Sequence, residues 1–299
     1  MENKYIKMQF LNILFAIYVK KVKCLPFTDF EIPIINESFE LITHNQDDHV
    51  SRKMHKITVW EPTETRCVIE ILSPNDFVID VGANIGYYTV LFSKLIGSQG
   101  EIIALEPDKK NFSILSLNVK LNQIKNVKLL CAAASDFQGD GMLYSSNWNF
   151  GDHRIYPSQD QSSGNNIKLI TLDDLIKQRG KAPKLLKIDC QGAEIMILKG
   201  LKESLNSVMR PKSIIVEFWP YGITQSGGEV KELLDLLPSS EYVLWDISRW
   251  HDSPKRTSIA NLEALSNNEI APETQMFTNI LMVLSQEVEL IKRIDSLCE

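Results

Sequence analysis

The chain has few cysteines, and none of them stand in the pairs that commonly bind metal. Its 299 residues contain five cysteines, and no C-x-x-C pair occurs. Scattered cysteines in odd number indicate neither a zinc site nor a disulfide framework. We therefore expect no metal centre and a reducing, cytoplasmic setting.

An excess of basic residues is also missing. The formal net charge is −6 and the pI is about 5.5, so no broad basic surface is expected and nucleic acid is not predicted as a partner. The composition, 44% hydrophobic and 23% charged, is that of an ordinary globular protein. Its length suits one large domain with an extension.

No transmembrane span is expected near the N-terminus. The apolar run over residues 8–19 would extend only ~18 Å as a helix, short of a ~30 Å hydrocarbon core. No small-residue cleavage site follows it. Lysines flank the run, so we interpret residues 1–24 as a helix that docks on the domain. Weak contact with a membrane surface is the alternative.

The dinucleotide-binding fingerprint G-x-G-x-x-G is absent as well. An apolar run, residues 77–81, ends on a carboxylate, and residues 87–96 show helical spacing, which together predict strand, tight turn and helix. The turn between them reads Asp80-Val-Gly82-Ala-Asn84-Ile-Gly86. Glycine there allows positive φ and close approach of a ligand, at the strand end where α/β sheets bind ligands.

Carboxylates follow the predicted strands and indicate the kind of ligand. Asp80 beside a pyrophosphate would repel it by roughly 1 to 4 kcal/mol at ~4 Å, whereas the cationic S-adenosylmethionine suits it. Glu106 lies 24 residues after Gly82, about the separation of a βαβ unit, and can accept both hydroxyls of a ribose. Asp136 follows a third strand and is predicted to accept from an exocyclic amine. An ordinary strand-to-turn junction is the other interpretation of Asp136.

Further candidates come from the second half of the chain. Asp189 ends the strand over residues 185–189, which adds it to the same rim of the sheet, and Lys187 is placed to pair with one of these acids. His153 lies in a long polar stretch, a type of segment that is usually functional or mobile. Its imidazole could serve as a base near neutral pH, although a solvated loop histidine is the alternative.

Three of these stretches resemble the FkbM family of S-adenosylmethionine-dependent methyltransferases. They are residues 80–89, residues 104–108 and residues 187–194. Two shorter stretches, residues 171–174 and 216–218, agree in order and spacing. The resemblance is good over residues 61–222, thinner to 284, and leaves residues 1–60 outside.

The chain departs from the family at one point in this pattern. The family's frequent glutamate before the glycine is Gln191, and Cys190 replaces an aliphatic residue or threonine. Gln191 cannot supply a charge, so it is not expected to act as a base.

The resemblance implies an α/β fold of the Rossmann-like class I methyltransferase type. Its sheet would have seven strands, mostly parallel with an antiparallel last strand, and helices on both faces. We expect residues 61–299 to form this domain after an N-terminal extension, residues 1–60, made of a helix and short strands. Residues 248–275 are interpreted as irregular chain that forms part of a substrate wall. The oligomeric state stays open.

The resemblance also implies O-methylation of a sugar or other small metabolite, with a small-molecule or glycan acceptor. An NAD-dependent oxidoreductase or epimerase and a catalytically silent nucleotide-binding domain are the alternatives. Asp189 is the first candidate for the base and His153 the second, while the acceptor would contact Arg154, Glu217 and Trp219. The cofactor is expected to be held by Asp80, Gly82, Asn84, Gly86, Glu106 and Asp136.

Overall fold

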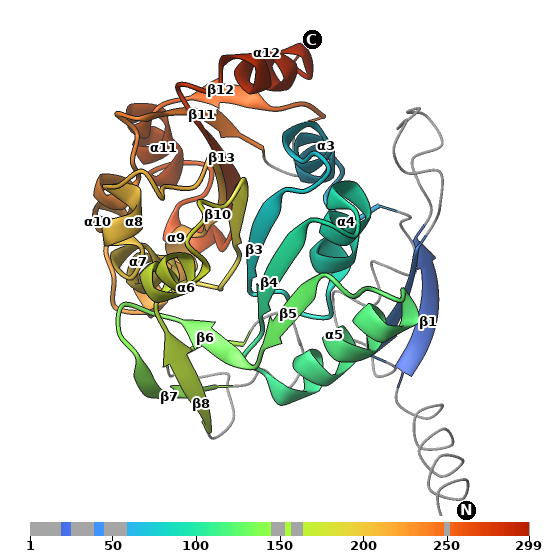
Figure 1. Cartoon of the computed structure of the whole chain (residues 1–299). Helices are drawn as coiled ribbons and strands as arrows, with labels where there is room; N and C mark the ends of the chain where they lie inside the picture. The colour runs from blue at the N-terminus through green and yellow to red at the C-terminus, as the bar shows by residue number, and fades with distance from the viewer. Residues whose placement is uncertain are drawn as a thin grey trace, which may run out of the picture.

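The computed structural model describes residues 19–24, 39–44, 59–144, 153–156, 164–247 and 252–298. A central eight-stranded sheet organises them, with strand order β12-β11-β13-β10-β9-β3-β4-β5 (Figure 1). The strands are β3 (Phe77–Val81), β4 (Glu101–Leu105), β5 (Val127–Leu130), β9 (Leu185–Ile188), β10 (Ser213–Phe218), β11 (Tyr242–Asp246), β12 (Lys255–Thr257) and β13 (Thr278–Leu284).

The middle of this sheet is parallel and buried on both faces. Every residue of β3, β9 and β10 is buried, which is why these strands read as continuous apolar runs and not as alternating patterns. β13 runs antiparallel to both β10 and β11. The expected class I methyltransferase fold with an antiparallel last strand is therefore confirmed.

The expected strand number was one too low. The connection over residues 248–275 is not irregular throughout, because it contains β12, α11 (Ile259–Ser266) and the 3₁₀ helix η1 (Pro272–Thr274). β12 pairs with β11 and extends the sheet at its edge. A three-residue edge strand is too short to show a hydrophobic period, so it has no signal in the sequence.

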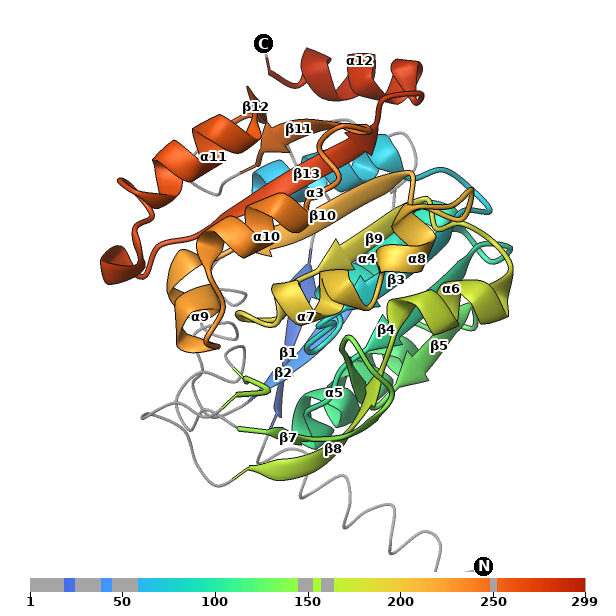
Figure 2. The same cartoon turned by 90° about the vertical axis from the view of Figure 1, so that its left-hand side faces the viewer.

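Helices cover both faces of the sheet. One face carries α3 (Pro62–Ile71), α4 (Tyr87–Ile96), α5 (Lys109–Leu121) and α12 (Val288–Ser296), which share one apolar core with the strands. A second core lies on the face seen in Figure 2. It is covered by α6 (Leu172–Arg179), α7 (Glu194–Lys199), α8 (Lys202–Leu205), α9 (Pro220–Gln225), α10 (Val230–Leu236) and α11.

A small second sheet lies beyond β5. It has the order β6-β8-β7, formed by β6 (Ala132–Ala134), β8 (Asn165–Ile170) and β7 (Gly139–Leu143). The chain therefore continues as a strand after Cys131, where the sequence suggested a turn. β6 pairs parallel to β8. The residues after β6 therefore lie away from the rim of the main sheet.

The N-terminal segment forms a two-stranded antiparallel sheet, β1 (Val19–Cys24) with β2 (Phe39–His44). Residues 19–24 are thus a strand and not part of the expected helix; residues 1–18 lie outside the described residues. β2 packs on α5, where the Asn118 side chain accepts from Ile42 N at 2.6 Å and donates to Ile42 O at 3.0 Å. Within the described part of the chain, no helix combines the length and apolar character needed to cross a bilayer.

Candidate active site

A cavity of about 560 Å³ opens at the ends of β3, β4, β9 and β10, a volume typical of small-molecule sites. It is the place where the sequence predicted a ligand. All but one of the predicted site residues line it, namely Asp80, Gly82, Asn84, Gly86, Glu106, His153, Arg154, Asp189, Glu217 and Trp219.

The glycine turn after β3 has the backbone geometry that its sequence requires. Gly82, Asn84 and Gly86 all have positive φ, of 80°, 51° and 95°. A Cβ on Gly82 would lie 2.0 Å from the carbonyl oxygen of Asp189. Glycine is therefore needed at position 82 both for the left-handed backbone and for the close approach of β3 to the end of β9.

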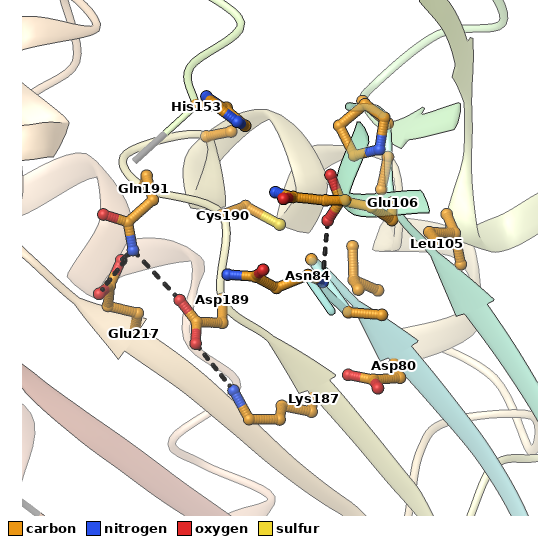
Figure 3. Close-up of a pocket in the computed structure, with 18 of the residues that line it drawn as sticks. Asp80, Asn84, Leu105, Glu106, His153, Lys187, Asp189, Cys190, Gln191 and Glu217 are labelled. Carbon is orange, nitrogen blue, oxygen red and sulfur yellow. Dashed lines mark hydrogen bonds and ion pairs between the residues drawn. The ribbon is translucent and has the colours of Figure 1, made fainter. Parts of the chain in front are cut away.

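Glu106 is fixed on the nucleoside side of the cavity. It is 5% exposed, and its Oε2 accepts from Asn84 N at 2.8 Å (Figure 3). Its Oε1 accepts from Asp108 N at 2.9 Å. Burial raises the pKa of Glu106 to about 8, against the opposing effect of these N–H donors. Each oxygen keeps a further lone pair for a ligand hydroxyl, so the carboxyl group can receive a ribose diol.

Asp80 lies at the end of β3 beneath the turn. It is 1% exposed, and Thr89 Oγ1 donates to its Oδ2 at 2.5 Å. Burial raises the pKa of Asp80 to about 6, while nearby Lys187 acts in the opposite direction. A buried carboxylate of this kind is stabilised by a cationic ligand.

Lys187 is the centre of a buried ion cluster. The side chain projects from β9, and its Nζ lies 3.0 Å from Asp189 Oδ2 and 3.4 Å from Glu64 Oε1. It also lies 4.6 Å from the centre of the Tyr88 ring. Burial alone would lower the pKa of Lys187, but the carboxylates of Asp189 and Glu64 outweigh it and hold the pKa well above its ordinary value. The expected pairing of Lys187 with a strand-end acid is confirmed.

Gln191 connects two carboxyl groups at the other end of this cluster. Its Nε2 donates to Asp189 Oδ1 at 3.2 Å and to both oxygens of Glu217 at 3.1 Å (Figure 3). The Asp189 side chain is 31% exposed, whereas Glu217 is 3% exposed and burial raises its pKa well above the ordinary value. Asp189 is thus the member of this group that a second substrate can reach.

His153 lies beside Asp108, and not in the cluster around Lys187. Its Nε2 is 3.8 Å from Asp108 Oδ2, and both side chains are nearly buried. Asp108 caps α5, accepting from Lys110 N and Asn111 N, and follows Glu106 by two residues. This position associates His153 with the nucleoside side of the cavity.

Arg154 is surrounded by aromatic rings. It is buried, and its guanidinium carbon lies 5.1 Å from the ring centre of Trp219, 5.7 Å from that of Tyr156 and 5.9 Å from that of Tyr221. Such ring contacts favour a cation and fix the planar group in one orientation.

Asp136 is the exception among the predicted site residues. It is exposed and does not line the cavity. Because Ala132–Ala134 continue as β6, Asp136 is carried past the rim, where its backbone approaches Gly200. The structure thus places Asp136 outside the cavity and gives no support to the expectation that it accepts from an exocyclic amine, although the three alanines before it do line the cavity.

Several lining residues were missed by sequence reasoning. They come from segments outside the glycine turn and strand ends, and include Trp60, Glu61, Tyr88, Gln275 and Phe277. Glu61 precedes Pro62, an order that by itself indicates only the start of a helix. Its place in the cavity depends on the packing of α3, which no local pattern reveals.

The site has the features that bound S-adenosylmethionine requires. Carboxylates suit its two positive charges, Glu106 suits its ribose, and the glycine turn lines the cavity with backbone that carries no side chain at positions 82 and 86. Among the residues that the structure describes, no cluster of His, Cys, Asp and Glu could hold a metal ion.

This fold and this site define an S-adenosylmethionine-dependent methyltransferase. Comparison with known families gives the same result. Residues 80–244, more than half of the chain, match the family described as the methyltransferase FkbM domain. The chain belongs to this family.

Individual relatives have low sequence identity to this chain. Methyltransferase sdnD of Sordaria araneosa is 30% identical over 185 residues, which cover 51% of this chain and 70% of that protein. The hexuronic acid methyltransferase AglP of Haloferax volcanii is 26% identical over 181 residues, covering 59% and 67%. Among solved structures, the precorrin-6y C5,15-methyltransferase of Geobacter metallireducens has a TM-score of 0.42 and 15% identity, covering 77% of this chain and 90% of that chain.

Proposed function

We propose that this methyltransferase acts on a hydroxyl group of a sugar or another small metabolite. The observation that carries the proposal is Asp189, a partly exposed carboxylate in the cavity with both oxygens held by neighbours, Lys187 and Gln191. An alcohol is a poor nucleophile while protonated, so a fixed carboxylate beside it is the group that the reaction needs. The name of the relative AglP, a hexuronic acid methyltransferase, supports a sugar acceptor.

Bound S-adenosylmethionine supplies a methyl group activated by its sulfonium. Asp80, Gly82, Asn84, Gly86 and Glu106 would hold the cofactor. Their contribution to rate is alignment, since a fixed in-line geometry removes much of the entropic barrier of a two-substrate reaction.

Asp189 would receive the proton of the acceptor hydroxyl on its carboxylate. Lys187 and Gln191 each donate to a different oxygen of Asp189, so the group keeps one orientation while the proton moves. Glu217 would hold Gln191 from the far side as a positioning residue, and its expected contact with the acceptor stays a prediction. His153 stays the second candidate for the base.

Arg154 and Trp219 would contact the acceptor. The guanidinium of Arg154, fixed by aromatic rings, suits a negatively charged or polar group of the acceptor, and a flat ring such as that of Trp219 suits the C–H face of a sugar. A uronic acid presents both features.

The test is a screen with methyl-labelled S-adenosylmethionine against neutral sugars, uronic acids and hydroxylated compounds that are not sugars. We expect label in an ether on a sugar hydroxyl. Calorimetry with S-adenosylmethionine and with NAD accompanies the screen. Tight binding of NAD without binding of S-adenosylmethionine contradicts the proposal, and so does cofactor binding without label transfer to any hydroxyl.

A further inference from the structure

Glu61 has a backbone conformation that its sequence disfavours. Its φ is 43° and its ψ is 71°, in the left-handed region. Glutamate rarely adopts this region, and the residue before a proline is pushed toward extended conformations. Pro62 follows directly, so two local preferences are overridden at one position.

Neighbouring groups hold this conformation in place. Thr65 N donates to Glu61 O at 2.8 Å, and Thr65 Oγ1 donates to Trp60 O at 2.7 Å. Tyr88 Oη donates to Glu61 Oε2 at 3.2 Å. Strain of this kind persists only where the surroundings over-determine it, and it gathers at functional sites.

Helix capping does not explain the strain. Glu61 stands at the N-cap of α3, but its side chain makes no capping hydrogen bond to the described backbone there. Glu61 instead lines the cavity, and its Oε2 accepts from Tyr88 Oη.

The carboxyl group of Glu61 belongs to the same end of the cavity as Asp189. Burial raises the pKa of Glu61 to about 8, and the charges of Glu64, Lys187 and Asp189 all act on it. The rings of Trp60, Tyr87 and Tyr88 line the cavity beside it. Carboxyl oxygens next to aromatic rings offer a sugar both hydroxyl acceptors and a surface for its C–H face.

Glu61 also lies outside residues 80–244, the part of the chain that matches the family. The hydrogen bond from Tyr88 therefore joins a residue outside the matched segment to one inside it.

We propose that Glu61 is an acceptor-binding residue whose strained backbone places its carboxyl group to accept hydrogen bonds from adjacent hydroxyls of a polyhydroxylated acceptor. The inference rests on the proposed function and specifies how that site selects its substrate.

The first experiment measures acceptor use. Variants Glu61→Gln and Glu61→Gly are compared with Glu70→Gln, a control on the same helix whose side chain lies 3.6 Å from Arg293 and does not line the cavity. With labelled cofactor and a panel of glucose, galactose and glucuronic acid, we expect kcat/KM for the acceptor to fall about 10- to 100-fold in both Glu61 variants, mostly through KM. Affinity for S-adenosylmethionine stays within about threefold, and Glu70→Gln behaves as wild type.

The second experiment measures strain without any acceptor. Glycine and asparagine tolerate the left-handed region, while glutamine does not. Glu61→Gly and Glu61→Asn should therefore melt a few degrees above Glu61→Gln. Equal melting temperatures of these three variants would overturn the inference that the backbone at Glu61 is strained. A wild-type kcat/KM in Glu61→Gln and Glu61→Gly would overturn the role of Glu61 in acceptor binding.

A binding measurement separates failure of this inference from failure of the proposed function. If the wild type labels no panel sugar, the same sugars are titrated into the protein saturated with S-adenosylhomocysteine. Sugar binding that is lost in Glu61→Gln and kept in Glu70→Gln supports the inference. No sugar binding by the wild type overturns it, while label transfer to a hydroxyl that is not on a sugar leaves the proposed function standing.

Discussion

Asp189 and Glu106 are both carboxylates at strand ends, yet their surroundings give them different tasks. Glu106 is buried and held by two backbone N–H groups, so it can bind a fixed diol but cannot move toward a second substrate. Asp189 is partly exposed and held by a lysine and an amide. The sequence placed both at the rim, but only side-chain packing separates their roles.

Replacement of Glu106 by alanine should weaken cofactor binding. Each charge-assisted hydrogen bond to a ribose hydroxyl contributes about 1.5 to 3 kcal/mol, so loss of one or two bonds should raise the Kd for S-adenosylmethionine by roughly one to three orders of magnitude. Calorimetry measures this directly. Asp136→Asn is the matched control, since Asp136 lies outside the cavity and should bind like wild type. An unchanged Kd in Glu106→Ala would show that the ribose is held elsewhere.

Replacement of Asp189 by asparagine keeps the shape and removes the base. We expect methyl transfer to fall by about 10² or more, while the Kd for S-adenosylmethionine stays nearly constant. Single-turnover kinetics with labelled cofactor separate the two effects. Wild-type turnover, or a loss confined to cofactor affinity, rejects the base role of Asp189.

His153→Asn tests the second candidate. Because His153 lies beside Asp108, we expect a modest rise in the Kd for S-adenosylmethionine, about three- to tenfold, with kcat retained. The measurement compares the rate–pH profiles of the wild type and of His153→Asn at saturating cofactor. Loss of the acidic limb of the profile together with kcat would instead identify His153 as the base.

At the scale of elements, the sequence predicted those parts of the fold that carry a long local signal. β3, the glycine turn and α4 were found within a residue, because a buried apolar run, two glycines and a helical stripe follow one another. β12 and β6 were not found, since strands of three residues have no measurable period. The position of Asp136 outside the cavity has the same origin, because β6 continues the extended chain as far as Ala134.

Asn118 of α5 shows how one side chain joins separate elements. It is fully buried and hydrogen-bonds to Ile42 N, Ile42 O and Ile85 O. It thereby ties the N-terminal sheet to the glycine turn, so residues 39–44 are packed on the domain as a structural part of it.

Asn118→Ala should therefore be strongly destabilising. Leaving buried backbone groups without partners costs about 1 to 3 kcal/mol each, so we expect a loss of roughly 2 to 5 kcal/mol in the free energy of unfolding. Urea denaturation measures it. The control is Asn206→Ala, where the exposed side chain donates only to Lys202 O and a change below about 1 kcal/mol is expected. Equal effects of the two substitutions would mean that Asn118 does not connect these elements.

For the whole molecule, buried carboxyl groups in the cavity govern the response to pH. The pKa of Asp80 is raised to about 6, and those of Glu61 and Glu106 to about 8, all by burial first. In the unfolded chain these pKa values are about 4. Between the two values the folded protein binds more protons than the unfolded chain, so the free energy of unfolding falls as pH rises.

The protein without cofactor should thus be more stable near pH 5 than near pH 8. S-adenosylmethionine favours the ionised carboxylates, so its addition should reduce this slope. Chemical denaturation at several pH values, with and without cofactor, measures both effects. Glu106→Gln should also flatten the slope. Stability that rises from pH 5 to pH 8 in the wild type would contradict the raised pKa values.

The buried cluster around Lys187 affects how the demethylated cofactor is exchanged for fresh S-adenosylmethionine. Three acids that line the cavity, Asp80, Asp189 and Glu61, act on this one lysine, so the cavity has a surplus of acidic groups close to the cofactor's place. An acidic cavity attracts a sulfonium but has no such attraction for the neutral thioether that remains once the methyl group has left. The same carboxylates that bind the methyl donor would therefore bind its product less tightly. Weaker product binding limits product inhibition and favours exchange for fresh donor.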